Sequence, residues 1–368
     1  MIKYNEIIWI SILLLTILLF KQTKNYKYLL LPIVFHILND IMFYCLGYSI
    51  FNTREMVKNC YEDATYLIDN NHSNGIDLGF NLYQGDITKN REQAQEDKFK
   101  FMWNKLKLKK GSRLIDIGCG FGDWLNYAKN RGANVYGINI SDAQGGVLKK
   151  RNIPHRVIDW SNLANTRDGF GLFKQFDCVT FMDTIEHYVP GNKRFDENFQ
   201  NETYIKMFNF ANNLLDDCGI GRVFISCLHQ VKKLDLKRMV ALWSLDRTMC
   251  GFYPIGKDGL IKNAVTWFDV ENVWDVTEDY RITSVLESDH FGVSGISDFK
   301  WNISKLCYII KSMVINPYFY HHLIVLYLNS WMVFYGDSHN RKKWSPEITD
   351  KESFVKDYFI VLQRRKCS

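Results

Sequence analysis

Three glycines at alternate positions follow a short apolar segment and form the clearest candidate for chemistry in the sequence. The segment RLIDI, residues 113–117, runs directly into GCGFGDWL. This places Asp116, Gly118, Gly120 and Gly122 in the pattern D-x-G-x-G-x-G. Glycine lets the backbone turn sharply and approach a ligand without a Cβ clash, and the helix start that follows presents unpaired N–H groups. The pattern predicts the seat of a cofactor.

A glycine-rich turn of this kind has competing interpretations. Dinucleotide-binding proteins use G-x-G-x-x-G at the same place, but here the third glycine comes one residue too early for that fingerprint. An acidic residue near the end of the first strand, here Asp116, is typical of S-adenosylmethionine sites. We therefore expect S-adenosylmethionine rather than a dinucleotide, with a purely structural turn as the alternative.

The elements around the glycine loop alternate between apolar runs and helical patterns. We expect a helix over residues 92–108, another over about 122–131, one from Asp142, and one near 201–215. Expected strands cover residues 113–117, 134–140, 155–160, 176–182 and 222–228, with a closing strand at 358–364. Strands separated by helices favour an α/β fold with a mostly parallel sheet covered on both faces.

Composition narrows the class of protein. The chain has 368 residues, 47% of them hydrophobic, and a formal charge of +6 without a dense basic run, so we expect no nucleic-acid partner. The nine cysteines are scattered without metal-ligand spacing, and the histidines show no HExxH arrangement, so we predict no metal site. Oligomeric state is left open.

The amino-terminal 52 residues are the most apolar part of the chain. Residues 7–20 form an unbroken apolar run, and Lys21, Lys24 and Lys27 follow it. Residues 28–51 form a second, longer apolar run that His36, Asn39 and Asp40 interrupt. We predict retained membrane segments, with a catalytic domain facing the cytoplasm. A span needs about 20 apolar residues, so a shallow hairpin, a single crossing by the second run, and a pair of buried helices all remain open.

Several motifs together resemble the cyclopropane-fatty-acid synthase-like family, which includes mycolic acid cyclopropane synthases and sphingolipid C-methyltransferases. They are LIDIGCGFG, then GINISDAQ, then FDCVTFMDTIEHY, with EQAQEDKFKFMWNKLKLKKG upstream. The resemblance covers about residues 75–365. It implies a Rossmann-like class I methyltransferase with a mostly parallel seven-stranded sheet and added helices. We divide the chain into a membrane anchor at 1–52, a helical lid at 53–110, a cofactor-binding core at 111–300, and a closing helix and strand at 301–368.

The resemblance also implies roles for individual residues. Gly118, Cys119, Gly120 and Gly122 would line the cofactor, Asn139, Ser141 and Gln144 would meet its ribose, and Asp159 and Trp160 would flank the adenine. Trp160 could stack on a purine, although a tryptophan that simply packs in the core is the alternative. Glu186 and His187 follow the fourth strand, where α/β sheets place their chemistry, and are our catalytic candidates.

This chain departs from the family at the anion site that holds a bicarbonate base. The family cysteine aligns with Leu82, its histidine aligns with Ser226, and its H-Y pair becomes His290 and Phe291. Methyl transfer to an alkene leaves a carbocation, and the base decides the product. We therefore favour methyl branching of an unsaturated lipid or fatty-acyl chain over cyclopropanation, with Glu186 as the base. N-methylation of a lipid head group or small amine, and a non-catalytic cofactor-binding protein, are the alternatives. The structural alternative for Glu186 is a carboxylate that caps a helix or pairs with Lys193 or Arg194.

Overall fold

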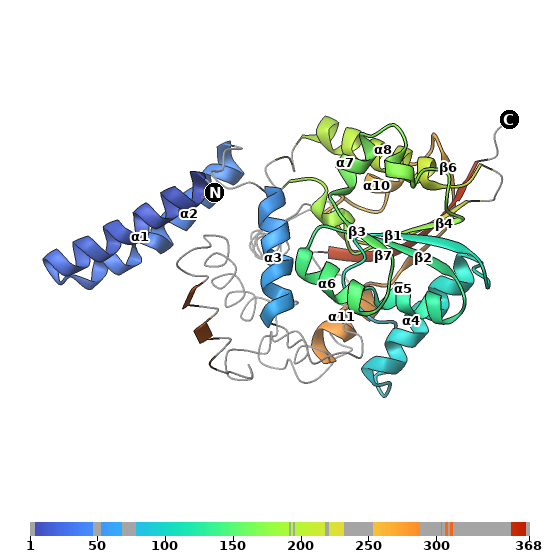
Figure 1. Cartoon of the computed structure of the whole chain (residues 1–368), viewed down its shortest axis with the longest axis horizontal. Coiled ribbons are helices and arrows are strands. Elements are labelled where there is room, and N and C mark those ends of the chain that lie inside the picture. Colours follow the sequence, from blue (N-terminus) through green and yellow to red (C-terminus); the bar gives the residue numbers. More distant parts are fainter. Residues whose placement is uncertain are drawn as a thin grey trace.

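A computed structural model of the chain shows one α/β body with a helical hairpin beside it (Figure 1). The structure describes only part of the chain, and every statement below concerns that part. The described residues are 4–46, 53–67, 79–190, 193, 196–217, 221–231, 253–286, 303, 306–307, 310–311 and 355–365.

A seven-stranded mixed sheet forms the centre of the body, in the order β3-β2-β1-β4-β5-β7-β6. The first five strands in this order are parallel, and β7 is antiparallel to both β5 and β6. The strands are β1 Arg113–Ile117, β2 Asn134–Asn139, β3 His155–Val157, β4 Cys178–Met182, β5 Arg222–Gln230, β6 Phe268–Asp275 and β7 Val355–Arg364.

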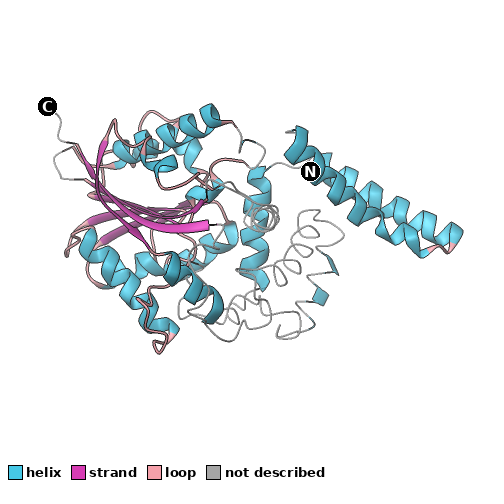
Figure 2. Cartoon of the chain, turned by 180° about the vertical axis from the view of Figure 1, so that it is seen from behind, coloured by secondary structure: helices cyan, strands magenta, loops and turns pink. Residues whose placement is uncertain are grey.

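Helices cover both faces of the sheet, because side chains of neighbouring strand residues point to opposite faces. Ile115 and Ile117 of β1 pack with one group of helices, whereas Leu114 packs with the other. The first group lies above the sheet in Figure 1 and comprises α7 Trp160–Ala164, α8 Glu197–Leu214 and α10 Asp258–Ile261. The second lies below and comprises α4 Arg91–Lys105, α5 Asp123–Asn130, α6 Asp142–Lys150 and α11 Thr277–Leu286. Figure 2 shows the same layers from behind.

The sequence predicted most of these elements within a few residues. Two expectations need correction. The strand expected at 155–160 ends at Val157, and Trp160 begins α7 instead, because Asp159 accepts a hydrogen bond from Ser161 N–H and caps that helix. The sequence also gave no signal for β6, whose outer positions are exposed and charged. The apolar helical stretch noted at 305–335 lies almost wholly outside the described residues.

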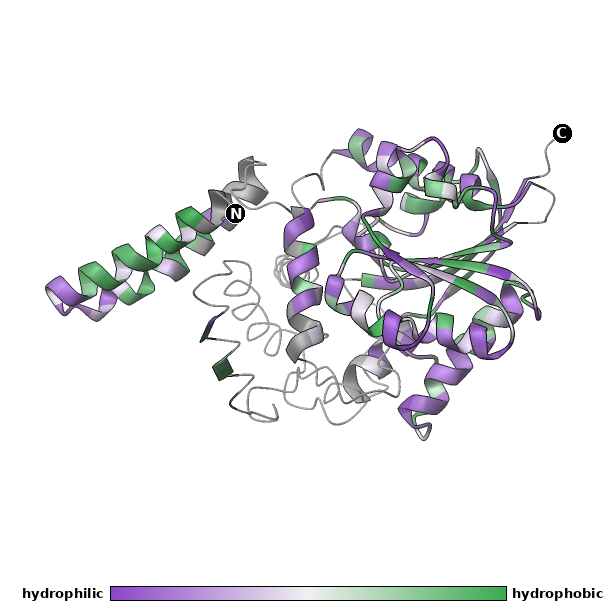
Figure 3. Ribbon diagram, viewed as in Figure 1, coloured by the Kyte–Doolittle hydropathy of each residue, from purple (hydrophilic) through white to green (hydrophobic). Residues whose placement is uncertain are grey.

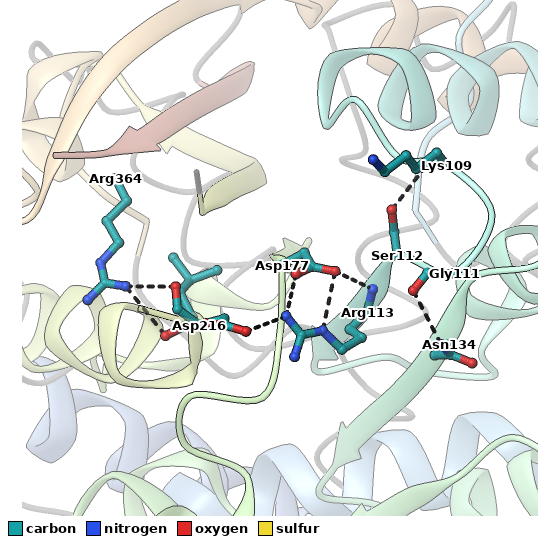
Figure 4. A network of polar contacts seen from close by, with 9 residues as sticks. Lys109, Gly111, Ser112, Arg113, Asn134, Asp177, Asp216 and Arg364 are labelled. Carbon is teal, nitrogen blue, oxygen red and sulfur yellow. Dashed lines mark hydrogen bonds and ion pairs between the residues drawn. The ribbon is translucent and has the colours of Figure 1, made fainter. Parts of the chain in front are cut away.

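A charged network joins the ends of the sheet strands where the parallel strands begin (Figure 4). The guanidinium of Arg113 donates to Asp177 at 2.6 Å and to Asp216 at 2.6 Å, and Arg364 donates to the carbonyl of Asp216 at 3.1 Å. These contacts join β1, the segment before β4, the segment after α8, and β7. The candidate site lies at the opposite end of the sheet, where the parallel strands end.

The amino-terminal residues form a hairpin that extends away from the body (Figures 1 and 3). It consists of α1 Tyr4–Thr23, the 3-10 turn η1 Tyr26–Leu30 and α2 Leu31–Leu46. Many of its apolar side chains are exposed, for example Leu14 at 55% and Leu18 at 62%. Within the described residues, no helix has both the length and the apolar content that crossing a membrane would require. A further helix, α3 Thr53–Leu67, follows the hairpin and packs against α6 of the body.

Candidate functional site

The glycine loop after β1 is held by the backbone of β2. The N–H groups of Gly118 and Cys119 both donate to the carbonyl of Ile138, at 2.8 and 3.0 Å. Gly118 has φ +82°, and a Cβ there would lie 2.3 Å from Thr184 Oγ1. Only glycine fits this position, because both the backbone conformation and the available space exclude a side chain. The loop then opens α5 immediately after Gly122.

Asp116 and Cys119 are both buried beside this loop. Asp116 is 2% exposed and accepts a hydrogen bond from Thr180 Oγ1 at 2.7 Å. Burial and the nearby Asp116 carboxylate raise the pKa of the Cys119 thiol well above its ordinary value, so the thiol stays protonated. The Cys119 side chain packs in the core that includes Leu125.

Asn139, Ser141 and Gln144, which the resemblance assigns to the ribose, lie at the end of β2 and the start of α6. Asn139 Nδ2 donates to the carbonyl of Gly120 at 2.8 Å, so the asparagine ties β2 to the glycine loop. Ser141 caps α6 by accepting from Gln144 N–H at 3.1 Å. Gln144 is 2% exposed, and its Nε2 has no hydrogen-bond partner among the described residues. The ribose contacts of these residues remain a prediction.

Asp159 and Trp160 lie at the start of α7, one strand further along the sheet. Trp160 is partly buried and packs against Tyr188, with ring centroids 4.6 Å apart, and against Phe210 at 6.0 Å. The tryptophan therefore belongs to an aromatic cluster of the core, while part of it stays exposed. Adenine stacking on Trp160 remains a prediction.

Glu186 lies where β4 has ended, on the 3-10 turn η3 Ile185–His187, and is 3% exposed. Its Oε1 accepts from Leu228 N–H at 2.7 Å, and its buried Oε2 has no hydrogen-bond partner among the described residues. Burial, with the neighbouring Asp183 carboxylate, raises the pKa of Glu186 to about 8. The alternative partner Lys193 bonds to Asp196 instead. A buried carboxyl group with this pKa suits a general base.

Two further carboxyl groups lie near Glu186. Asp183 accepts a short hydrogen bond from Ser226 Oγ, and Asp183 N–H donates to the Ser226 carbonyl at 3.0 Å. Asp357 of β7 is 1% exposed and lies opposite Leu228 in the β5–β7 register. Burial, together with Asp183 and Glu186, raises the pKa of Asp357 well above its ordinary value. The three carboxyls are mutually destabilising when charged, so the group retains protons at neutral pH.

Two positions that the resemblance aligns with the family's bicarbonate ligands hold side chains with other contacts. Leu82 is 4% exposed and packs in the core that contains Phe359. Ser226 is fully buried and bonded to Asp183, as described above. His290 and Phe291 lie outside the described residues. His187, the second catalytic candidate, bonds through Nε2 to the hydroxyl of Tyr61 on α3 at 2.7 Å.

Sequence reasoning missed two contributors to this edge of the sheet. Asp357 lies one residue before the closing strand expected at 358–364, and its burial depends on the antiparallel pairing with β5. Residues of α3 were hidden because the helix reaches the site only by packing on α6, more than 70 residues later in the chain. A polar stripe, residues 54, 58 and 62 at four-residue spacing, is the signal that could have indicated a docking face.

Comparison with known proteins finds a family that matches part of the chain. The family model described as mycolic acid cyclopropane synthetase matches residues 83–245, which include the glycine loop, the β2 edge and Glu186. Over this region the chain is similar to the cyclopropane synthase-like family of S-adenosylmethionine-dependent methyltransferases. This confirms the resemblance found in the sequence.

Two curated relatives illustrate the range of this cyclopropane synthase-like family. A Mycobacterium tuberculosis protein named "Probable fatty acid methyltransferase" is 47% identical over 104 residues, covering 28% of this chain and 24% of its own length. The sphingolipid C9-methyltransferase of Candida albicans is 33% identical over 114 residues, covering 28% of this chain and 22% of its own length. The chain thus spans about a quarter of the length of the curated relatives it matches.

A solved structure agrees with the fold. The cyclopropane synthase MmaA2 from Mycobacterium tuberculosis superposes with a TM-score of 0.57 at 15% identity, covering 86% of this chain and 100% of that one. At this identity the likeness establishes the methyltransferase α/β fold with its seven-stranded sheet and extra helices, and nothing about the substrate.

The buried carboxyls predict how stability depends on pH. A carboxyl whose pKa is raised by folding holds a proton that the unfolded chain has already released, so its stabilising contribution is lost as pH rises through the folded pKa. Burial lowers the pKa of His229 to about 4. This group makes the free energy of unfolding rise with pH, but only below about pH 6.5, the pKa of an unfolded histidine. We expect the free energy of unfolding to fall between pH 6.5 and 8, and to fall less in Glu186→Gln.

Urea unfolding across this range measures the slope. The exposed Glu202→Gln is the control and should keep the wild-type slope. Equal slopes in all three proteins would contradict the assignment.

Proposed function

We propose that this chain transfers a methyl group from S-adenosylmethionine to an unsaturated lipid or fatty-acyl chain, and that it yields a methyl branch. The observation that supports this most strongly is Glu186, a buried carboxyl held by one oxygen while the other has no partner among the described residues. The similarity to S-adenosylmethionine-dependent methyltransferases supports the cofactor. Gly118, Gly120 and Gly122 fit it, because all three have a positive φ that lets the backbone turn at the end of β1, and the space beside Gly120 is open for a ligand.

The chemistry follows from what each group can do. S-adenosylmethionine, when bound, supplies a methyl group on a sulfonium, which the π electrons of a carbon–carbon double bond attack as the carbon–sulfur bond breaks. The substrate is left with a positive charge on the neighbouring carbon. Glu186 in its charged form then removes a proton from the carbon that gained the methyl group, and those C–H electrons restore the double bond. The Leu228 N–H orients the carboxylate during this step.

Leu82 and Ser226 support branching rather than ring closure. Ring closure requires a base placed against the newly added methyl group. In this chain the side chains that align with the family's anion ligands are an apolar core residue and a serine bonded to Asp183. Glu186 is therefore the base we assign, with His187 and Tyr61 bracing the turn that carries it.

Replacing the base gives the functional test. We expect purified Glu186→Gln to lose at least about 100-fold in turnover with an unsaturated lipid, because a positioned base contributes roughly 10²–10⁴-fold. Its affinity for S-adenosylhomocysteine should stay unchanged. Wild-type turnover should rise with pH toward about 8, where Glu186 becomes charged. Glu202→Gln is the matched control and should behave as wild type.

Product analysis separates the possible reactions. Mass spectrometry of lipids from cells that express the chain should show one added methylene in the chain fragment. Ozonolysis should still cleave the product, since a branched alkene keeps its double bond and a cyclopropane does not. An ozone-resistant product would overturn branching, and an added methylene in the head-group fragment would overturn chain methylation. No mass change despite cofactor binding would indicate a non-catalytic protein.

We further propose that the protein associates with membranes, with its catalytic domain facing the cytoplasm. The support is the hairpin of α1 and α2, whose exposed leucines and isoleucines extend away from the body (Figure 3). Lys21, Lys24 and Lys27 at its turn are exposed and can reach anionic head groups while the apolar sides enter the acyl region. A hairpin that lies in the interface needs no crossing.

Vesicle flotation tests this association. The full-length protein should float with vesicles that contain anionic lipid. Replacing Leu14, Leu15 and Leu18 by serine should weaken binding at least about tenfold, because each removes apolar area that would enter the bilayer. Replacing the same leucines by isoleucine is the control and should leave flotation unchanged. Failure of the wild-type protein to float, or equal binding by the serine variant, would contradict the proposal.

A further inference from the structure

One face of α3 contacts the starts of α6 and α7, including Ser141 and Asp159 from the predicted cofactor site. Arg54, Lys58 and Glu62 are four residues apart and therefore share that face. Arg54 reaches Ser161 Oγ at 3.0 Å and Asp159 at 3.4 Å. Lys58 pairs with Asp142 at 2.5 Å in an exposed contact. The helix that follows the hairpin thus covers the ends of β2 and β3.

Glu62 makes the most extensive of these contacts. Its Oε1 accepts from Ser141 Oγ at 3.1 Å and from Asp142 N–H at 2.6 Å, and its Oε2 accepts from Ala143 N–H at 3.1 Å. A carboxylate has about four acceptor positions, and Oε2 takes one short contact here. Glu62 is only partly buried. It can therefore accept a further hydrogen bond while keeping its place at the start of α6.

The side-chain amide of Asn139, which ends β2, already bonds to the backbone through both its oxygen and its nitrogen. Its Oδ1 accepts from the N–H groups of Ile140 at 2.8 Å and Ser141 at 3.3 Å. Its Nδ2 donates to the carbonyl of Gly120. The amide is thus committed to the backbone, and it carries no charge. Ribose hydroxyls in nucleotide-binding α/β proteins are commonly met by a carboxylate near this point of the sheet.

A second observation points to a ligand at the same turn. Gln144 of α6 is 2% exposed, and its Nε2 has no hydrogen-bond partner among the described residues. A buried donor without a partner costs free energy unless something else accepts from it. Ser141 caps α6 through Gln144 N–H, and Glu62 adds bonds to the N–H groups of Asp142 and Ala143, so its carboxylate is held at the start of α6.

We propose that Glu62 is the carboxylate that accepts hydrogen bonds from the ribose hydroxyls of the cofactor, reaching the site from α3 rather than from β2. The inference rests on the proposed function, in which S-adenosylmethionine binds at this edge. It makes α3 a part of the cofactor site. The helix that joins the apolar hairpin to the body then also determines how tightly the adenosine moiety is held.

Calorimetric titration with three ligands tests this assignment. The ligands are S-adenosylhomocysteine and its analogues that lack the 2′ or the 3′ ribose hydroxyl. For wild-type protein we expect one of the analogues to bind at least about tenfold more weakly than the parent, because a hydrogen bond to a charged acceptor is lost. In Glu62→Ala that penalty should shrink below about threefold, since the acceptor is already gone.

Lys58→Ala is the matched control, because it removes another contact between α3 and α6 and leaves Glu62 in place. It should keep the full wild-type penalty. If Glu62→Ala keeps the full penalty while weakening every ligand equally, Glu62 only docks α3 and the assignment is overturned. If wild-type protein binds none of the ligands, the proposed function itself fails. The two failures are therefore distinguishable.

Discussion

The double hydrogen bond from Gly118 and Cys119 to the carbonyl of Ile138 is the constraint on which the site depends. It forces the chain to turn at the end of β1 with a positive φ at Gly118, against Thr184, where no side chain fits. Asn139, the residue after Ile138, lies within reach of the Gly120 carbonyl and bonds to it. Two helix starts and the end of β4 are thereby gathered at one edge of a parallel sheet.

Contacts at the opposite end of the sheet, together with the apolar core, stabilise a fold that keeps carboxyl groups buried at the site. Arg113, Asp177, Asp216 and Arg364 fix the beginnings of the strands with polar contacts near solvent. At the site edge, by contrast, Glu186 and Asp357 are removed from water and remain incompletely paired, which raises their pKa values. Such groups destabilise the fold, and the large aromatic and aliphatic core on both sheet faces offsets their cost. A carboxyl group kept in this state is the property that proton abstraction requires.

The sequence predicted what depends on local pattern. The glycine loop and the parallel strands follow from spacing and periodicity, and Glu186 was found through the family resemblance. The closing strand was recognised although β6 was not. Contributions from distant segments could not be predicted, because they depend on packing: Asp357 faces the site only through its register with Leu228, and Glu62 only because α3 docks on α6. Trp160 was misplaced because the cap formed by Asp159 ends the strand pattern early.

The central claim is that the glycine loop of this cyclopropane synthase-like chain holds S-adenosylmethionine. Calorimetric titration of the folded full-length protein with S-adenosylhomocysteine tests that claim most directly, because it needs neither a lipid nor turnover. The account predicts saturable binding of one ligand per chain, lost in Gly118→Ala, whose new Cβ would collide with Thr184. Absence of binding to the folded wild-type protein would contradict it.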